Sequence, residues 1–295
     1  MEKLETLVSN PIKKDILLKH YTTYKVGGKA DMLITPSSIE ELIKVLKFVR
    51  ENHIKYKILG NGSNVIFSNK DYHGVIIKLD EFQKLEMLGR EIVVGAGYSL
   101  MRLAMKSSLA GLSGMEFATG IPGTIGGAVF MNAGAYLSDM GYIVKSIKVL
   151  TPDYEIVEMS NKELNFHYRT SFLKEHPEYI CLEANIVLKH GKKEAIMEVI
   201  QDRKKRRLET QPLEYPSAGS VFRNPIGDSA GRIIESVGLK GTKIGGAMVS
   251  EKHANFIINV GDATGEDIKE LIDLVKKTVK EKTGIELKAE QEFVE

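Results

Sequence analysis

The spacing of hydrophobic residues predicts a helix between short strands near the start of the chain. Hydrophobic residues recur at helical intervals from Ile39 to Val49. Ser37 stands three residues before Glu40, which is the spacing of a capping box at the beginning of a helix. Strand-like runs occupy residues 31–35, 56–59 and 74–79. These patterns predict a small α+β unit that ends near Leu79.

The hydrophobic pattern then restarts and predicts a second α+β unit. A strand at 91–94 comes first, and Ser99 is placed to cap a helix that Gly111 ends. Later runs predict a hairpin formed by 143–150 and 154–159, and a strand over 180–189 that pairs with it. A helix is expected over 192–208, with its apolar face formed by Ala195, Ile196, Val199 and Ile200.

A change of composition after Pro212 marks a third unit. Its pattern predicts helices over 228–237 and 264–283, and strands over 254–260 and 285–287. The expected organisation is therefore three α+β units, at residues 1–79, 80–208 and 209–295.

Two stretches rich in glycine interrupt this pattern. Residues 111–132 hold so much glycine that neither a helix nor a strand is expected there, and residues 60–64 read Gly-Asn-Gly-Ser-Asn. Glycine lets backbone N–H groups approach a bound diphosphate because no Cβ is in the way. A tight turn is an equally good interpretation of the shorter stretch alone. Together the two stretches predict loops around one extended anionic cofactor.

These loops do not follow the fingerprints of other nucleotide-binding folds. Gly95 and Gly97 lack the third glycine of a Rossmann motif, because Leu100 stands in its place. The chain also has no glycine loop that ends in Gly-Lys-Ser/Thr.

Composition narrows the function classes further. The net charge of +2 gives no reason to expect nucleic acid or an acidic membrane surface as a partner. The basic residues 203–207 are expected to be a solvated helix end. Cys181 is the only cysteine, so an internal disulfide is excluded and a buried, inert thiol is expected. No spacing of His, Asp and Glu indicates a metal site.

No apolar run approaches the about 20 residues of a membrane span, and the first residues do not resemble a signal peptide. We therefore expect a cytoplasmic protein without membrane insertion. The sequence does not predict the oligomeric state.

Three short polar segments are candidates for chemistry. They are residues 167–171 (His-Tyr-Arg-Thr-Ser), residues 216–225, which contain Ser220, Arg223 and Asn224, and residues 288–290, which end in Glu290. Each has an ordinary structural explanation when taken alone. Their occurrence beside two glycine loops indicates one active site.

In their order along the chain and in their residues, these segments resemble the UDP-N-acetylenolpyruvoylglucosamine reductase family, flavoenzymes of peptidoglycan precursor synthesis. The resemblance covers nearly the whole chain, and its motifs are residues 21–28, 60–64, 120–127 and 218–225. It implies the FAD-binding α+β fold of vanillyl-alcohol-oxidase-like flavoproteins, with two FAD-binding subdomains and a C-terminal substrate domain. The implied cofactor-binding residues are Tyr24, Gly60, Asn61, Gly62, Ser63, Asn64, Gly120, Ile121, Pro122, Gly123, Thr124, Gly126 and Gly127.

The resemblance also implies a reaction in which NADPH reduces FAD and a hydride then passes to the enolpyruvyl group of the substrate. Hydride addition leaves negative charge beside the substrate carboxylate, and a planar cation such as Arg169 would stabilise that charge. Glu290 completes the site, and Ser220 would protonate the carbon. Arg223 and Asn224 suit the substrate diphosphate, and Tyr168 would shape the pocket.

The sequence departs from the family near its end. A valine and an arginine usually follow the C-terminal glutamate, whereas Gln291 and Glu292 follow Glu290 here. Gln291 could replace Glu290 only as a hydrogen-bonding group, and Glu292 is a second candidate carboxylate. The chain lacks an inserted tyrosine-bearing loop and so resembles the shorter subgroup.

No histidine lies between Gly60 and Asn69, so FAD is expected to bind without a covalent bond. His253 is expected to be structural. Two other functions fit parts of the pattern. An oxidase of the same architecture would use oxygen, and a flavin-binding module without catalysis would have no need for Arg169, Ser220 and Glu290 together.

Overall fold

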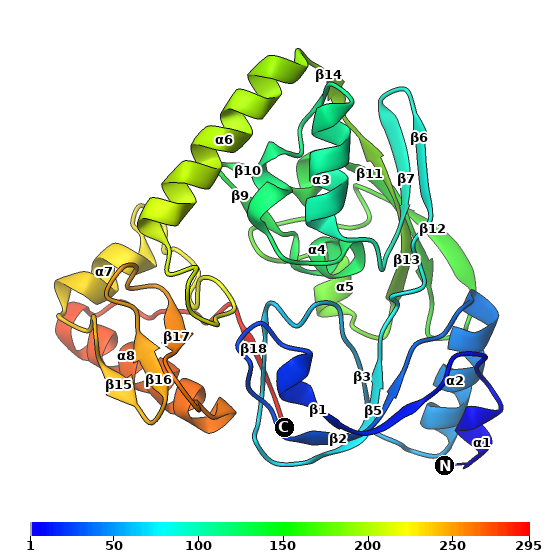
Figure 1. The fold of residues 1–295 in the computed structure, drawn as a ribbon, viewed down its shortest axis with the longest axis horizontal. Helices are drawn as coiled ribbons and strands as arrows, with labels where there is room; N and C mark the ends of the chain where they lie inside the picture. The colour runs from blue at the N-terminus through cyan, green and yellow to red at the C-terminus, as the bar shows by residue number, and fades with distance from the viewer. Residues whose placement is uncertain (1) are drawn as a thin grey trace. The chain divides into compact units, whose positions relative to one another are not determined.

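The computed structural model describes residues 2–295 and divides into two compact units. Unit 1 contains the residues up to Lys13, residues 33–61 and residues 75–204, and unit 2 contains residues 14–32, 62–74 and 205–295. The chain passes between the units inside β1 (Lys13–Leu17), β2 (Lys29–Ile34), β5 (Tyr72–Ile77) and α6 (Lys193–Thr210), and inside the loop 60–64. Figure 1 follows the chain from blue to red.

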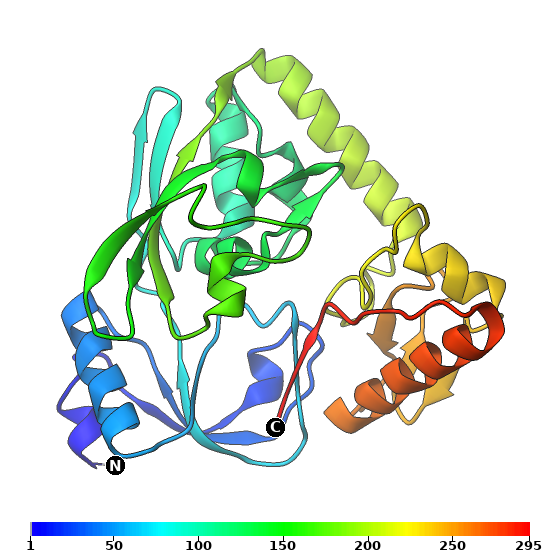
Figure 2. The same ribbon diagram turned by 180° about the vertical axis from the view of Figure 1, so that it is seen from behind.

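Unit 1 is built around an antiparallel sheet in the strand order β12-β11-β13-β7-β6. Its strands are β6 (Leu85–Leu88), β7 (Glu91–Gly95), β11 (Val144–Leu150), β12 (Ile156–Ser160) and β13 (Ile180–Val187). Val149 lies opposite Cys181, and Ala184 lies opposite Val94. These four residues are buried, so one face of the sheet contributes to the core. Figure 2 shows the sheet from behind.

Two helices of unit 1, α3 and α4, lie next to or within the glycine-rich stretch. α3 (Leu100–Leu109) begins at Ser99, whose side chain accepts a hydrogen bond from the amide of Arg102. α4 (Ile125–Met131) begins at Thr124 in the same way and packs against β13 and β7. The short helical segments of unit 1 are α1 (Glu2–Glu5), α5 (Phe172–Glu175), η2 (Glu116–Gly120) and η3 (Met140–Tyr142).

The predicted helix near the start of the chain is α2 (Ile39–Glu51), which buries Leu42, Val45, Leu46 and Val49. β3 (Tyr56–Ile58) follows it and pairs in parallel with β5, with Tyr56 opposite Val75. Two further pairs are formed by two-residue strands: β8 (Leu112–Ser113) with β14 (Lys189–His190), and β9 (Gly134–Ala135) with β10 (Ser138–Asp139).

Unit 2 combines a small antiparallel sheet with two helices. The sheet contains β15 (Lys243–Ile244), β16 (Ala247–Val249) and β17 (Ile257–Asn259). The helices are α7 (Ala230–Ser236) and α8 (Gly265–Thr283), and η1 (Leu18–His20) is a single turn. α8 begins with a capping box between Thr264 and Asp267 and ends at Gly284, whose φ is +75°.

A long-range strand pair completes unit 2. β4 (Val65–Phe67) pairs in parallel with β18 (Glu292–Val294), with Ile66 opposite Phe293. The hydrophobic core of the unit contains Tyr24, Val26 and Ile66 together with many residues after 205. Three segments that are far apart in sequence therefore share one core.

The structure corrects three expectations. The cap of α2 is Ser38, which accepts from the amide of Glu41, so the cap lies one residue later than Ser37. Residues 285–287 are not a strand, and the C-terminal strand is β18 instead. The glycine-rich stretch does contain a helix, α4. Gly126 lies inside α4 where an added Cβ would be 3.1 Å from the Cβ of Ala96, so close packing explains this glycine.

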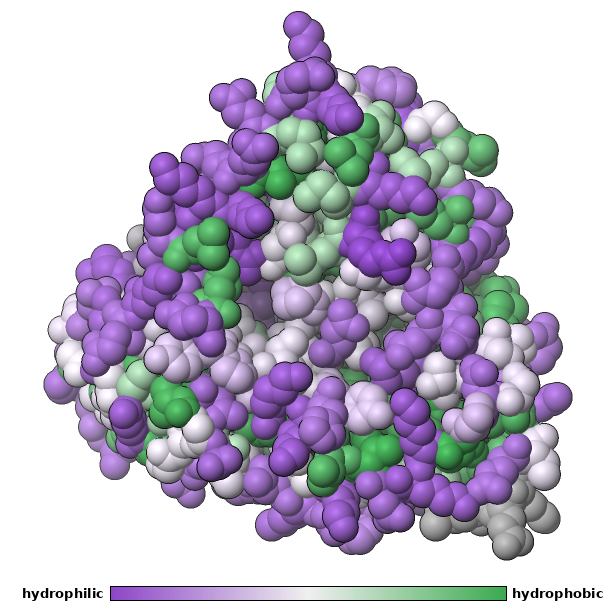
Figure 3. Space-filling view, viewed as in Figure 1, coloured by the Kyte–Doolittle hydropathy of each residue, from purple (hydrophilic) through white to green (hydrophobic). Residues whose placement is uncertain are grey.

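The predicted face of α6 is only partly correct. Ile196 and Ile200 are buried, whereas Val199 is 41% exposed and Ala195 is exposed. On the face drawn in Figure 3, hydrophobic side chains occur in small groups among hydrophilic ones. Three exposed apolar residues lie along α3: Met101, Met105 and Leu109. Among the helices of residues 2–295, none has the length and apolar character needed to span a membrane.

Candidate active site

The two predicted cofactor loops touch each other in unit 1. A Cβ added to Gly60 would lie 2.7 Å from the side-chain oxygen of Thr124, so only glycine allows this approach. At Gly123, in contrast, nothing lies within 4 Å of an added Cβ. The backbone of the second loop therefore faces open space beside the first loop. Exposed glycine backbone of this kind fits the diphosphate of a dinucleotide cofactor.

A buried lysine supports the first loop. The ammonium group of Lys78 donates to the carbonyl of Gly60 at 2.6 Å and lies 3.4 Å from a carboxylate oxygen of Asp80. Its side chain is 10% exposed. In the sequence, the one signal of Lys78 is a charged residue at the end of the apolar run 75–77, and it predicts no role in the site. A cation at this position suits a site for an anionic cofactor.

The end of the first loop belongs to unit 2. The carbonyl of Gly62 accepts a hydrogen bond from the amide of Thr23 at 3.2 Å. The side-chain amide of Asn64 donates to the carbonyl of Glu290 at 3.1 Å, and the amide of Glu292 donates to the carbonyl of Asn64 at 3.0 Å. Residues predicted from separate motifs, Asn64 and Glu290, are thus brought together.

The C-terminal end of α4 holds the segment that carries Arg169. The hydroxyl of Ser171 donates to the carbonyl of Phe130 at 2.8 Å. Asn132, a buried residue in the left-handed region, donates from its side chain to the carbonyl of His167 at 2.8 Å. The helix that follows the second cofactor loop therefore also fixes the polar segment 167–171.

Arg169 lies at the tip of a tight turn in this segment. His167 and Thr170 exchange two backbone hydrogen bonds, of 3.1 and 3.0 Å, so the turn is closed on both sides. Arg169 has a φ of +57°, a conformation that costs a non-glycine residue free energy. Its Nη2 donates to the carbonyl of Gly134 at 2.7 Å, and its guanidinium lies 5.0 Å from the ring centre of Tyr168. The turn thus presents Tyr168 and Arg169 together.

Ser220 lies in unit 2, in a loop fixed by backbone pairing. Ser220 forms an isolated antiparallel bridge with Phe256, and the amide of Val221 donates to the carbonyl of Asn255 at 2.8 Å. The buried side chain of Asn255 accepts from the amide of Phe222 at 2.9 Å and donates to its carbonyl at 2.8 Å. Gly219 precedes Ser220 with a φ of +74°, which only glycine adopts readily.

Glu290 lies beside this serine loop. Its amide donates to the carbonyl of Val221 at 2.8 Å. Two residues before Glu290, the carbonyl of Lys288 accepts a hydrogen bond from the amide of Arg223 at 2.9 Å. Unit 2 therefore brings the Ser220 and Glu290 segments together, as a shared site requires. Arg169 belongs to unit 1.

A buried glutamine, Gln291, also contacts the serine loop. Its Nε2 donates to the carbonyls of Ala218, Gly219 and Ser220 at 3.1, 3.3 and 3.4 Å. Its Oε1 accepts from the hydroxyl of Tyr24 at 2.9 Å. Tyr24 is fully buried in the core of unit 2, and this burial raises the pKa of its phenol, an effect that the hydrogen bond with Gln291 opposes.

The other predicted residues of unit 2 have mixed surroundings. Arg223 is half-buried and Asn224 is exposed. The side-chain oxygen of Asn224 accepts from the amide of Ala230, at the start of α7. Glu292 is exposed. The burial of Tyr72 and the negative charge of Glu292 together raise the pKa of the Tyr72 phenol to about 12. Glu292 thus lies near a buried phenol.

Two groups with reactive side chains have structural surroundings. Cys181 is buried in β13, and burial raises the pKa of its thiol to about 12, so the thiol is inert at neutral pH. His253 is partly buried, and burial lowers the pKa of its imidazole. Its Nδ1 accepts a hydrogen bond from the amide of Asn255 at 3.2 Å, so His253 supports the residue that holds Phe222.

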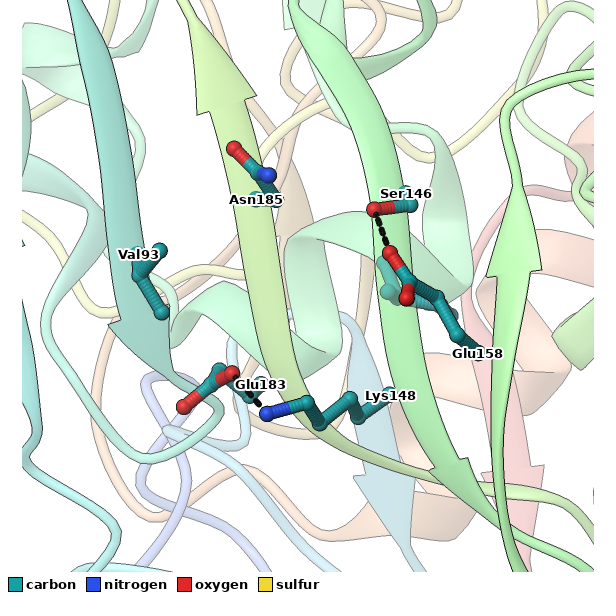
Figure 4. A pocket seen from close by; sticks show the side chains of 7 residues that line it. Val93, Ser146, Lys148, Glu158, Glu183 and Asn185 are labelled. Carbon is teal, nitrogen blue, oxygen red and sulfur yellow. Dashed lines mark hydrogen bonds and ion pairs between the residues drawn. The ribbon is translucent and has the colours of Figure 1, made fainter.

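A separate small pocket of about 140 Å³ lies on the five-stranded sheet (Figure 4) and contains none of the predicted site residues. Its charged and polar groups mostly pair with one another. Lys148 contacts Glu183 at 2.9 Å, and the hydroxyl of Ser146 donates to Glu158 at 2.6 Å. These pairs account for most of the polar lining, whereas the side-chain oxygen of Asn185 is buried without a hydrogen-bond partner among the described residues.

Comparisons with known proteins agree with this geometry. Residues 30–160 match the family model described as an FAD binding domain, and residues 211–294 match that of the C-terminal domain of UDP-N-acetylenolpyruvoylglucosamine reductase. The reductase of Anoxybacillus flavithermus is 46% identical and aligns over 100% of this chain and 99% of its own length. The chain belongs to the UDP-N-acetylenolpyruvoylglucosamine reductase family.

Other members of this reductase family give the same result. The Bacillus subtilis reductase is 44% identical over 94% of this chain and 92% of its own length. The crystal structure of UDP-N-acetylenolpyruvylglucosamine reductase from Thermus caldophilus is 37% identical, with a TM-score of 0.83 over 97% of this chain and 99% of that one.

Membership in the reductase family confirms the resemblance stated from the motifs. It also confirms the α+β fold class with an FAD-binding domain and a separate C-terminal domain, and the assignment as an FAD-containing oxidoreductase. The structure adds three residues that the sequence analysis did not assign to the site: Lys78, Asn132 and Asn255.

Proposed function

We propose that this chain uses NADPH to reduce the enolpyruvyl ether of UDP-N-acetylglucosamine to UDP-N-acetylmuramate, a step in peptidoglycan precursor synthesis. The observation that carries the proposal is the hydrogen bond of 2.8 Å from the amide of Glu290 to the carbonyl of Val221, which ties Glu290 to the Ser220 loop in a chain of the reductase family. This bond supports the proposal because it brings the segment of Ser220, the proposed proton donor, beside the segment of Glu290.

The two glycine loops, 60–64 and 120–127, would hold FAD without a covalent bond. Nothing lies within 4 Å of an added Cβ at Gly123, Gly60 allows the close approach of Thr124, and Lys78 adds a positive charge beside Gly60. Backbone N–H groups and a nearby cation are suited to a diphosphate. When bound, FAD would accept reducing equivalents from NADPH and supply a hydride to the substrate.

The chain's own residues would stabilise and protonate the substrate. Hydride addition at C3 moves the π electrons of the enol ether to C2 and the adjoining carboxylate. Arg169 would stabilise this charge with its planar guanidinium, an effect that is largest in the transition state. Ser220 would then give its hydroxyl proton to C2 and regain one from water. Glu290 would share a proton with the charged oxygens.

The remaining assignments concern substrate binding and organisation. Tyr168, Arg223 and Asn224 would contact the substrate, with Arg223 and Asn224 near its diphosphate. Residues 1–79 and 80–208 would form the FAD-binding subdomains, and residues 209–295 would form the substrate-binding domain. The small hydrophilic substrate and NADPH lead us to expect that the enzyme acts in the cytoplasm.

Replacing Ser220 by Ala tests the function, with the two half-reactions measured separately under anaerobic conditions. NADPH should bleach the flavin absorbance of the variant at the wild-type rate, because Ser220 has no part in that step. Reoxidation by the enolpyruvyl substrate should slow by about 10²–10⁴-fold, the usual contribution of a positioned proton donor. Reoxidation at the wild-type rate would exclude the proton-donor role. A wild-type enzyme that oxygen reoxidises but the substrate does not would be an oxidase.

A further inference from the structure

The serine loop is anchored differently on its two sides. After Ser220, the backbone pairs with Phe256 and with the segment 288–290, and Asn255 holds Phe222. Before Ser220, the chain turns at Gly219, where the φ is +74° and nothing lies within 4 Å of an added Cβ. Farther from Ser220 on this side, the carbonyl of Pro216 accepts from the amide of Asn259 at 2.9 Å. Residue 219 has neither a side chain of its own nor a strand partner, so the orientation of the chain there depends largely on what binds the neighbouring carbonyl groups.

Gln291 is the side chain that meets those carbonyl groups. Its Nε2 lies 3.1 Å from the oxygen of Ala218, 3.3 Å from that of Gly219 and 3.4 Å from that of Ser220. A carbonyl oxygen can only accept, so the group facing these three oxygens must be a donor. The two hydrogens of an amide NH₂ group satisfy this requirement, whereas a carboxylate would place like partial charges together.

The other end of the same side chain is fixed by a buried phenol. The hydroxyl of Tyr24 donates to Oε1 of Gln291 at 2.9 Å, and the backbone carbonyl of Tyr24 accepts from the side chain of Asn259 at 3.0 Å. Tyr24 is 0% exposed and Gln291 is 8% exposed. Hydrogen bonds shielded from water in this way strongly favour one orientation of the amide.

Gln291 also directly follows Glu290, whose amide is bonded to Val221. The anchored side chain of Gln291 therefore fixes two groups. It holds Glu290, its neighbour in sequence, and it holds the carbonyl of Ser220 through a hydrogen bond. We infer that Gln291 is a positioning residue that holds Ser220 in register with Glu290 for proton transfer to the substrate. This inference rests on the proton-donor role proposed for Ser220.

Two substitutions separate the parts of this role. Gln291→Met keeps the length of the side chain and removes both hydrogen-bonding groups. Gln291→Glu keeps the acceptor for Tyr24 and replaces the NH₂ donor by an oxygen that faces three carbonyl groups. Burial, these carbonyl groups and the neighbouring Glu290 and Glu292 all favour the protonated form of the introduced carboxyl. Once protonated, it regains a hydrogen that can be donated to the loop.

The experiment measures the two half-reactions of the FAD-loaded enzyme between pH 6 and pH 8, per bound flavin. Reduction by NADPH should stay within about twofold of wild type in both variants, because the loop has no part in it. Reoxidation by the enolpyruvyl substrate should fall by about tenfold or more in Gln291→Met at every pH. In Gln291→Glu, the ratio of the reoxidation rate to that of wild type should rise several-fold from pH 8 to pH 6.

Gln211 offers a matched control in the same unit. Its side-chain oxygen accepts a hydrogen bond of 3.0 Å from Nε of Arg207, a contact that involves no residue of the serine loop. Gln211→Met should reoxidise at the wild-type rate. Reoxidation of Gln291→Met at the wild-type rate would overturn the inference. An equal slowing of both half-reactions would also overturn it, since that pattern indicates a general structural role.

Ser220→Ala, measured in parallel, distinguishes this inference from the proposed function. If transfer is lost in Ser220→Ala and retained in Gln291→Met, the assignment of Gln291 alone is wrong. If Ser220→Ala retains transfer, the proton-donor role of Ser220 is wrong, whatever Gln291 does.

Discussion

The Arg169 turn and the Ser220 loop are held in opposite ways. Arg169 has a left-handed backbone and is partly exposed, and its turn is tied to the end of α4 by two side chains, Asn132 and Ser171. Ser220 lies between backbone pairs to two other segments, and two buried carboxamides, Asn255 and Gln291, bind the loop around it. One residue is presented by a strained turn, and the other by a rigid buried frame.

This difference fits the work proposed for each residue. An arginine that stabilises developing charge acts through a long side chain, so the turn has only to project it in the right direction. A serine side chain is short, so its oxygen can reach the substrate carbon only if the backbone itself is placed accurately. We therefore expect changes in the turn to affect chemistry with little loss of stability, and changes around the loop to affect both.

The largest effect is expected from removing the charge of Arg169. Arg169→Met should lower kcat by about 10²–10³-fold, because the charge that forms next to the substrate carboxylate loses its stabilising group, while KM changes little. Arg169→Gly should be equally inactive. It should nevertheless be more stable than Arg169→Met by about 1 kcal/mol, because glycine adopts a φ of +57° without strain.

Steady-state kinetics and urea unfolding of these two variants test the comparison directly. A raised KM with unchanged kcat would make Arg169 a binding residue. Equal stability of the Gly and Met variants would show that the turn stores no strain.

A smaller effect is expected at the first cofactor loop, whose first two residues belong to unit 1, as the whole Arg169 turn does. Lys78→Met should weaken FAD binding by about tenfold, because the loop loses a charged hydrogen bond to the carbonyl of Gly60 and a nearby positive charge. The measurement is quenching of flavin fluorescence on titration of the apoprotein with FAD. Lys57, a half-buried lysine on β3 in the same unit, provides a control as Lys57→Met. Unchanged affinity in Lys78→Met would separate this lysine from the cofactor site.

The smallest effect concerns the support of the Ser220 loop at low pH. Burial lowers the pKa of His253 below its ordinary value of 6.5, so above that pH both the folded and the unfolded chain carry a neutral imidazole. As the pH falls below about 6.5, the unfolded chain takes up a proton that the folded chain resists, and the free energy of unfolding decreases. Protonation would also remove the acceptor used by the amide of Asn255.

Urea unfolding of wild type and His253→Gln at pH 7.5 and pH 5.5 measures this contribution. The wild-type midpoint should fall further between the two pH values than the midpoint of the variant. An equal fall of the midpoint in both proteins would show that protonation of His253 does not weaken the support of the Ser220 loop.

Much of the scaffold follows from local sequence. Ser99 and Gly284 mark helix boundaries through capping chemistry that depends on neighbouring residues alone. The hairpin of β11 and β12 and the pairing of β11 with β13 also follow from alternating hydrophobic residues. β4 and β18 were missed because each is a three-residue strand, and among the described residues its only strand partner is the other, at the opposite end of the sequence.

The residues of the candidate site also divide into those that local sequence predicts and those that depend on the folded structure. Arg169, Ser220 and Glu290 are predicted from motifs, and the structure places the segments of Ser220 and Glu290 side by side. The contacts of Gln291 and Lys78 depend on which carbonyl groups lie opposite them after folding, and a single sequence does not contain that information. Gly126 also has a structural role that its motif does not reveal, because an added Cβ there would crowd Ala96 inside α4.

The hydrogen bond between Tyr24 and Gln291 joins residues 267 positions apart. A ribosome that adds about 5–20 residues per second would need roughly 15 to 50 s to reach Gln291 after Tyr24. For most of that time, Tyr24 and Val26 lack the core they will occupy, since most of that core is encoded after residue 205. Unit 2 can therefore be completed only after all of unit 1 has been made, although it includes some of the first residues, and a nascent chain stopped a few residues short would lose Gln291 and β18 together.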